Sequence, residues 1–252
     1  DDLAESCGEF APFITTWKVE AGDLEITIPT AAGQTYNYDV DWGDGESDTG
    51  QTGDASHTYD SADTYTVKIT GTFPQIEFFN SGDEDKIMSV EQWGDIEWAS
   101  MRKAFQGATN LEINAEDEPD LSNATSMLEM FSGATSVNEG LENWDVSTIT
   151  SMFGVFDGAT SFNGDISKWD VSNVRNMHSI FKGSSFNGDI SGWDVSNVEI
   201  MNYMFFNSPF NGDISAWDVG NVQSMEAMFR TSQFNGDISG WNTSSVTNML
   251  AT

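Results

Sequence analysis

The chain has very few of the residues that would tie it to a disulfide framework, a metal-thiolate site or a nucleic acid. Cys7 is the only cysteine among 252 residues, which excludes an intrachain disulfide within them. Nine Lys and Arg stand against 41 Asp and Glu, and the formal charge of -32 would repel phosphate backbones and anionic lipid surfaces. No apolar run approaches the roughly 20 residues of a membrane span. We therefore expect no nucleic-acid partner, no membrane insertion and a fold that is stabilised by packing.

The chain contains one six-residue motif that occurs four times. Phe162-Asn163-Gly164-Asp165-Ile166-Ser167 recurs at Phe186, Phe210 and Phe234, each copy 24 residues after the last. A fixed period of this length indicates stacked repeats. The register extends further, because seven methionines fall 24 to 26 residues apart, each eight residues after a Trp or, once, after Pro119. The methionines are Met101, Met127, Met152, Met177, Met201, Met225 and Met249.

Each repeat has the pattern of one short strand followed by one short helix. Alternation places Phe162 and Ile166 on one face of the strand and the polar residues on the other. Ser172 is the expected helix N-cap, and Met177, Ile180 and Phe181 follow at helical spacing. Such Met and aromatic stripes are typical of a core. The predicted fold is a mixed β and α/β one, with a right-handed solenoid that has one strand and one helix per turn.

The repeat text FNGDIS-x-WDVSNV-xx-M-xx-MF resembles the bacterial surface-protein repeat of about 26 residues, which is related to BspA-like leucine-rich repeats. The resemblance covers about residues 86–252 and implies a leucine-rich-repeat-like solenoid on a secreted, often adhesive, bacterial protein without catalytic residues. The second module departs from the pattern, because Pro119 replaces Trp and Glu116-Asp117-Glu118 is inserted. A bulged loop is expected there.

Upstream of the repeats, three segments alternate in the manner of β-strands: residues 24–28, 36–42 and 65–70. Trp42-Gly43-Asp44-Gly45, followed by His57-Thr58-Tyr59 and Thr64-Tyr65-Thr66-Val67, resembles the polycystic-kidney-disease (PKD) type of immunoglobulin-like sandwich, a common extracellular module. The expected organisation is an N-terminal segment (1–14), a PKD-like β-sandwich (15–74) and a solenoid of about seven repeats (75–252). Residues 74–85 would form the join, and residues 86–93 the first solenoid strand.

We find no motif that indicates catalysis. The chain has no nucleophile motif, phosphate-binding glycine loop or zinc-ligand spacing. A packed or solvent-facing imidazole is the favoured interpretation for its two histidines, His57 and His178. Carboxylate pairs carry little weight as candidate acid and base groups in so acidic a chain. We therefore expect a protein that is not an enzyme.

The candidate binding surface is the outward face of the repeated strands, where identical residues should align in ladders of Asn, Asp and Ser. Neighbouring Asp carboxylates would repel by about 3 kcal/mol at about 5 Å and an effective dielectric constant of about 20. Hydrogen bonds could relieve this repulsion, and so could bound Ca²⁺, the one cofactor we consider. The candidate ligand-binding residues are Asn163, Asp165, Ser167, Asn187, Asp189, Ser191, Asn211, Asp213, Ser215, Asn235, Asp237 and Ser239.

The resemblances imply a secreted or cell-surface bacterial protein, and the repeated polar face suits adhesion or ligand binding. Because the polar ladders do not vary, they suit a repetitive ligand such as a polysaccharide, or a structural role; a surface protein is the other candidate partner. Two alternatives are a carbohydrate-binding appendage of a larger extracellular enzyme and a passive spacer. The chain starts without a signal segment and stops inside a repeat, as an excised piece would. Val246, Met249 and Leu250 could then mediate self-association.

Overall fold

The computed structural model describes residues 10–79 and 82–251, and all regular secondary structure in those ranges is β. The first nine residues of the expected N-terminal segment, and Cys7 with them, lie outside the described residues. The strands are β1 (Phe13–Lys18), β2 (Glu25–Ile28), β3 (Asn37–Asp41), β4 (Ser47–Gln51), β5 (Ala55–Thr58), β6 (Thr64–Thr72), β7 (Ile87–Gln92) and β8 (Glu112–Ile113).

The N-terminal part consists of two sheets, which we call the sandwich; its assignment to the PKD type of immunoglobulin-like domain stays a prediction. Six strands form one sheet in the order β4-β3-β6-β1-β7-β8, and β2 pairs antiparallel with β5 in a second. The three strands expected from the sequence are confirmed as β2, β3 and β6. Inward residues of the two sheets, such as Trp17 of β1 and Ile26 of β2, belong to one hydrophobic cluster. Alternation in the sequence therefore located these strands correctly.

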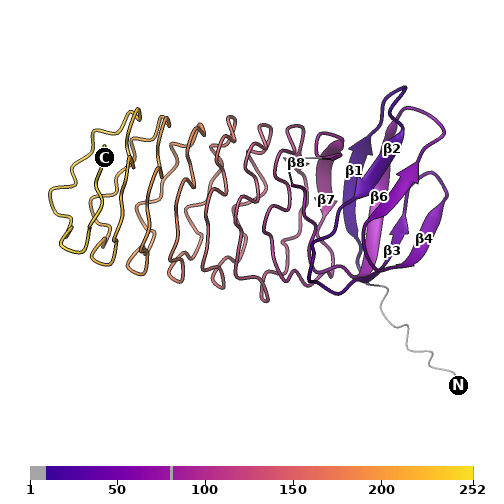
Figure 1. Cartoon of the computed structure of the whole chain (residues 1–252), viewed down its shortest axis with the longest axis horizontal. Helices are drawn as coiled ribbons and strands as arrows, with labels where there is room; N and C mark the ends of the chain where they lie inside the picture. Colours follow the sequence, from indigo (N-terminus) through magenta and orange to yellow (C-terminus); the bar gives the residue numbers. More distant parts are fainter. Residues whose placement is uncertain (1–9, 80–81, 252) are drawn as a thin grey trace, which may run out of the picture.

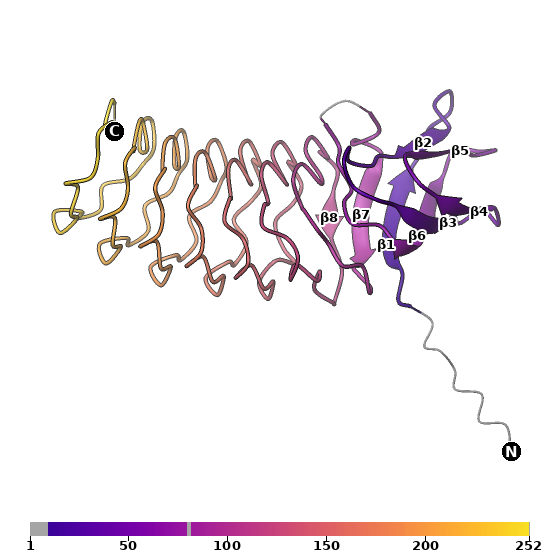
Figure 2. The ribbon, with the colours of Figure 1, turned by 60° about the horizontal axis from the view of Figure 1, so that its bottom comes forward.

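The solenoid starts from an edge of the larger sheet, and Figures 1 and 2 show its coils following one another away from β7. The strand expected at residues 86–93 is confirmed as β7, which pairs antiparallel with β1 and parallel with β8. Buried residues from Phe13 in β1 to Met228 near the last coils form one continuous cluster. The sandwich thus covers the first coil of the solenoid with paired backbone and shared aromatic packing.

The predicted helix in each repeat is wrong, because no helix occurs in residues 10–79 and 82–251. Ser172 accordingly caps none. The segment around each Met is a series of turns that we call the Met-turn segment, from two residues before the Met to six after it. Its six complete copies are residues 99–107, 125–133, 150–158, 175–183, 199–207 and 223–231.

Backbone hydrogen bonding explains why turns replace the helix. From each Met onward, every second N–H donates to a carbonyl of the next coil. In most coils the N–H groups three and five residues after the Met close turns within the coil, and the N–H directly after the Met donates to a side-chain oxygen, as His178 N–H does to Asn176 Oδ1. At one interface the donors are Met177, Ser179, Phe181 and Gly183, and the acceptors are Ile200, Asn202, Met204 and Phe206. A two-turn helix would leave most of its terminal groups unpaired. Stacked turns satisfy the main chain, and their apolar residues still fall at i, i+3 and i+4.

The turn geometry requires left-handed backbone at two positions of each Met-turn segment. The residue two after the Met has φ near that of Ser179 (56°), and the residue six after it is usually glycine, as at Gly183 (67°). Non-glycine residues occupy most of the first positions, including Tyr203 at 56°. Non-glycine residues rarely adopt a positive φ, because it is sterically unfavourable for them. Their residue types therefore did not indicate these turns.

The predicted strand at Phe162–Ser167 is also absent; parallel pairing occurs instead through single bridges next to the Met, such as Ser151 with Asn176. The expected alternation of burial is nevertheless confirmed, since Phe162 and Ile166 are buried and Asn163 is exposed. Phe rings stack from coil to coil, with 5.8 Å between the centroids of Phe181 and Phe205. The core stripe expected from the sequence is therefore correct even though its helix is not.

Candidate functional sites

The twelve residues predicted to bind ligand lie on one exposed face of the solenoid, which we call the Asn-Asp face. The structure aligns them in the expected columns but uses their polar groups within the fold. Asn163 Oδ1 accepts a hydrogen bond from the backbone N–H of Asn187 at 2.8 Å, and Asn187 Oδ1 accepts from Asn211 N–H at the same distance. The column continues to Asn235 and starts from Asn138. The Asn side chain thus replaces the missing main-chain ladder.

The Asp column is held by the Ser two residues later. Asp165 Oδ1 accepts a hydrogen bond from the N–H of Ser167 at 3.0 Å, and Asp189 Oδ1 accepts from Ser191 N–H at 2.9 Å. Hydrogen bonds from the Ser167 hydroxyl and backbone lower the pKa of Asp165, and those from Ser191 lower the pKa of Asp189. Asp213 and Asp237 have lowered pKa values for the same reason. Hydrogen bonds therefore favour the charged form of every Asp in the column.

Calcium binding to this column stays a prediction. Over residues 10–79 and 82–251, no group of three or more His, Cys, Asp or Glu side chains is arranged to hold a metal ion. The columns supply one carboxylate per coil rather than a cluster, whereas Ca²⁺ takes six to eight oxygen ligands.

A helix that could span a membrane is not found among residues 10–79 and 82–251.

A second exposed surface, which we call the Met-turn face, is formed by the side chains one and five residues after each Met. It differs from the Asn-Asp face because every coil carries a different residue. The first column reads Arg102, Leu128, Phe153, His178, Asn202 and Glu226, and the second reads Gln106, Ser132, Asp157, Lys182, Phe206 and Arg230. All twelve are half-buried or exposed. Sequence analysis assigned these segments to helices and missed this surface; the lack of repetition in the two columns was the available signal.

Charge also separates the two faces. Five of the nine Lys and Arg residues of the chain lie in the six Met-turn segments, together with only four of the 41 acidic residues. Several pair across coils, as Lys182 Nζ does with Asp157 Oδ2 at 2.9 Å and Arg175 with Glu199 at 3.2 Å. The Met-turn segments are therefore close to neutral on a molecule whose formal charge is -32.

A strip of half-buried aromatic rings crosses the Met-turn face. His178 stacks on Phe153 with 4.5 Å between centroids and contacts Tyr203 at 5.6 Å, and Tyr203 in turn contacts Phe206 at 5.8 Å. Burial lowers the pKa of His178. Tyr203 donates its hydroxyl hydrogen to Glu226 Oε1 at 2.7 Å. The histidine is a packed imidazole in a row of aromatic side chains.

The other histidine belongs to the packing of the sandwich. His57 stacks on Trp42 at 5.0 Å, and its Nε2 lies 2.7 Å from Asp44 Oδ2. Tyr59 donates to the backbone carbonyl of Trp42 at 3.0 Å and stacks on Tyr65 at 3.7 Å. The Trp-Gly-Asp-Gly and His-Thr-Tyr phrases therefore meet in one structural cluster.

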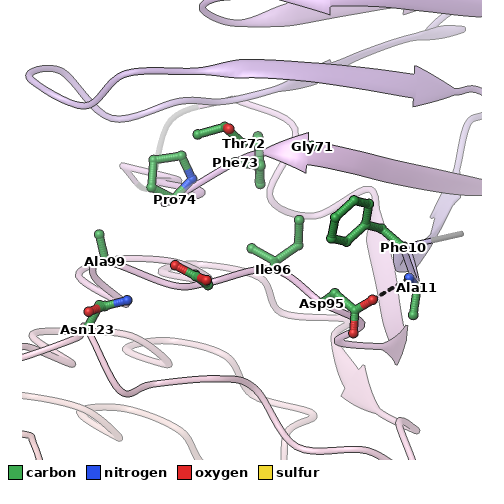
Figure 3. Close-up of a pocket in the computed structure, with 11 residues that line it drawn as sticks. Phe10, Ala11, Gly71, Thr72, Phe73, Pro74, Asp95, Ile96, Ala99 and Asn123 are labelled. Carbon is green, nitrogen blue, oxygen red and sulfur yellow. Dashed lines mark hydrogen bonds between the residues drawn. The ribbon is translucent and has the colours of Figure 1, made fainter. Parts of the chain in front are cut away.

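A cavity of about 550 Å³ lies where the sandwich meets the solenoid. Figure 3 shows the end of β6 with the two residues that follow it, Gly71 to Pro74, on one side and the segment that follows β7 on the other. Phe10, which is 73% exposed, lies at one end, and Asn123 lies beyond Ala99 at the other. Sequence analysis did not identify this pocket, because its lining comes from four separate segments.

Comparison with known proteins gives one family. No curated protein and no solved structure matches the chain. The model of a repeat-containing family described as "Mycoplasma protein of unknown function, DUF285" matches residues 99–209 and 185–252, which is more than half of the chain. These residues contain the Met-turn segments and the four copies of the Phe-Asn-Gly-Asp-Ile-Ser phrase. The chain is therefore a member of the DUF285 family.

Proposed function

We propose that this chain is a non-catalytic binding module of a secreted or cell-surface bacterial protein and that its Met-turn face binds a protein partner. The observation that carries the proposal is the contrast between coils: the Met-turn columns change at every coil, while the Asn-Asp columns repeat. An irregular protein surface can be matched only by side chains that vary along the solenoid.

Local chemistry supports a protein partner on this face. The aromatic strip from Phe153 to Phe206 supplies the type of residue that is enriched in interfaces. Arg230 lies over the Phe206 ring at 5.9 Å and is exposed, which makes it a candidate anchor for a carboxylate. The near-neutral charge allows approach by acidic proteins, which the rest of the surface would repel.

The resemblances point to an extracellular setting. BspA-like repeats occur on secreted and surface-anchored proteins, and the sandwich phrases resemble a PKD-type module that is common outside cells. We propose extracellular or surface localisation on this basis. Two alternative functions are compatible with the same resemblances. The chain could be a carbohydrate-binding appendage that uses the Asn-Asp face, or a spacer that binds nothing.

A paired-variant binding assay tests the proposal. Labelled protein is titrated against arrays of extracellular proteins and of polysaccharides, using wild type, the Met-turn variant F206A/R230A and the Asn-Asp variant D189N/D213N. The Asn substitutions keep the Oδ1 acceptors of the Asp column. We expect saturable binding to a protein that the Met-turn variant loses and the Asn-Asp variant retains.

Other outcomes contradict the proposal in different ways. Saturable polysaccharide binding that only D189N/D213N abolishes would support the carbohydrate-binding alternative. No saturable binding to either array would support the spacer. Unchanged far-UV circular dichroism of both variants confirms that lost binding does not report lost folding.

A further inference from the structure

The pocket between the sandwich and the solenoid has an apolar floor. Phe73, directly after β6, is 1% exposed, and Ile96, which follows β7, is 3% exposed. Pro74 and Ala99 extend this apolar surface on facing segments (Figure 3). A volume of about 550 Å³ falls within the range of small-molecule sites.

The charged side chains of the lining are both hydrogen-bond acceptors, whereas Thr72 and Asn123 can donate as well as accept. Asp95 and Glu97 contribute exposed carboxylates, and no Lys, Arg or His is among the lining residues. Asp95 Oδ2 accepts a hydrogen bond from Ala11 N–H at 2.7 Å, which fixes the backbone next to Phe10 (Figure 3). The two carboxylates therefore favour a ligand that supplies hydrogen-bond donors and a positive charge.

Phe10 adds an aromatic wall. Its ring is 73% exposed and lies on the same side of the pocket as Asp95. A cation is attracted to the face of an aromatic ring in addition to its attraction to carboxylates. An apolar floor, an acceptor lining and an aromatic wall together match a cation that is carried on an apolar body.

We propose that this pocket binds an alkylguanidinium or alkylammonium group. The charged end would lie near Glu97 and Asp95, and its alkyl part would contact Ile96 and Phe73. The group could come from a free amine or from an Arg or Lys side chain of a peptide. This site is separate from the Met-turn face, so the proposal does not rest on the binding function proposed above.

Calorimetric titration of the full chain with butylguanidinium tests the proposal, and butylurea serves as a neutral probe of the same shape. We expect saturable binding of butylguanidinium at moderate salt and at least about tenfold weaker binding of butylurea, which corresponds to about 1.4 kcal/mol. Equal affinities, or no saturable binding of butylguanidinium, would overturn the proposal.

Matched variants separate the pocket from the general attraction of an acidic protein for cations. Glu97→Gln removes a charge inside the pocket, and Glu142→Gln removes one from an exposed residue that does not line it. We expect about a tenfold loss of affinity for the first and almost none for the second. Phe10→Ala should weaken binding, and Phe10→Tyr should restore it. Equal losses for the two Glu variants would show non-specific attraction and refute the site.

The source of the cation is distinguished with peptides. A short peptide containing one internal Arg is compared with the same peptide containing citrulline. Tighter binding of the Arg peptide than of butylguanidinium assigns the pocket to a peptide side chain. Binding of butylguanidinium with no binding of the peptide assigns it to a free amine. Both results support the proposed ligand chemistry.

Discussion

The Asn-Asp face and the Met-turn face are built by the same repeat, yet the first is identical in four successive coils and the second changes at each one. On the Asn-Asp face the side chains complete the backbone ladder, because each Asn Oδ1 accepts the N–H of the next coil. On the Met-turn face, backbone carbonyls of the next coil accept every second N–H, and a side chain bridges coils in the same way only locally, as Asn202 Oδ1 does for Glu226 N–H. Where side chains form the hydrogen bonds between coils, the same residue must recur in each coil. Where the backbone forms these hydrogen bonds, the side chains are free to vary.

The largest effect should come from the core beneath both faces. Phe205 is buried and stacks on Phe210 at 4.0 Å, whereas its neighbour Phe206 is only half-buried on the Met-turn face. We expect Phe205→Ala to lower the free energy of unfolding by about 3–5 kcal/mol and Phe206→Ala by less than about 1 kcal/mol. Urea denaturation measures both. Equal losses would show that Phe206 is structural and would weaken its assignment to a binding face.

Substituting one glycine near each face by alanine tests how closely the backbones of neighbouring coils approach each other there. A Cβ on Gly164, which lies between Asn163 and Asp165 of the Asn-Asp face, would be 2.1 Å from the carbonyl oxygen of Asn138. Gly183 has φ of +67° but no atom closer than 3.8 Å to a Cβ. We expect Gly164→Ala to cost about 3 kcal/mol through overpacking and Gly183→Ala about 1 kcal/mol through strain. The opposite order in thermal or urea unfolding would contradict this account of coil spacing.

Each hydrogen bond of the Asn column should contribute less to the free energy of unfolding than the core packing and the glycine positions do. Asn187→Ala removes the acceptor of Asn211 N–H, and we expect a loss of about 1 kcal/mol in unfolding free energy. Arg175→Ala is the matched control, because its pair with Glu199 is exposed and worth about 0.5 kcal/mol or less. If the two substitutions had the same effect, the Asn column would have no special structural role.

Acid should weaken the Asn-Asp face gradually. The pKa values of its four Asp residues are lowered in the folded state, so the unfolded chain binds protons first as the pH falls. Their contribution is complete above about pH 5 and declines as the pH falls through the unfolded-state pKa of about 4 and then the lower folded-state pKa. Unfolding measured between pH 5 and 3, at high salt to screen the net charge, should show this decline, and D189N/D213N should reduce its slope. A rise in stability on acidification at high salt would contradict the assignment.

Strands β2, β3, β6 and β7, the repeat register and the inward stripe were predicted correctly, because burial follows the spacing of apolar residues in all of them. Strands β1, β4 and β5 were not predicted. The prediction failed for the Met-turn segments because Met177, Ile180 and Phe181 have the spacing of a helix, and the left-handed backbone at Ser179 leaves no mark in its residue type. The twelve Asn-Asp positions were placed on the correct surface. Their hydrogen bonds to the next coil were not predicted, and neither was the pocket. Both depend on how distant segments stack, which the spacing of apolar residues does not reveal.

Residue-resolved hydrogen exchange of the amides of Asn187, Asn211 and Asn235 tests most directly the claim that the Asn-Asp face serves the fold and leaves binding to the Met-turn face. These residues have exposed side chains, but their N–H groups donate to the Asn of the preceding coil. We predict slow exchange at all three in the wild type and fast exchange at Asn211 in Asn187→Ala. Fast exchange in the wild type would mean that the Asn side chains are free to bind ligand, and would contradict the division of roles between the two faces.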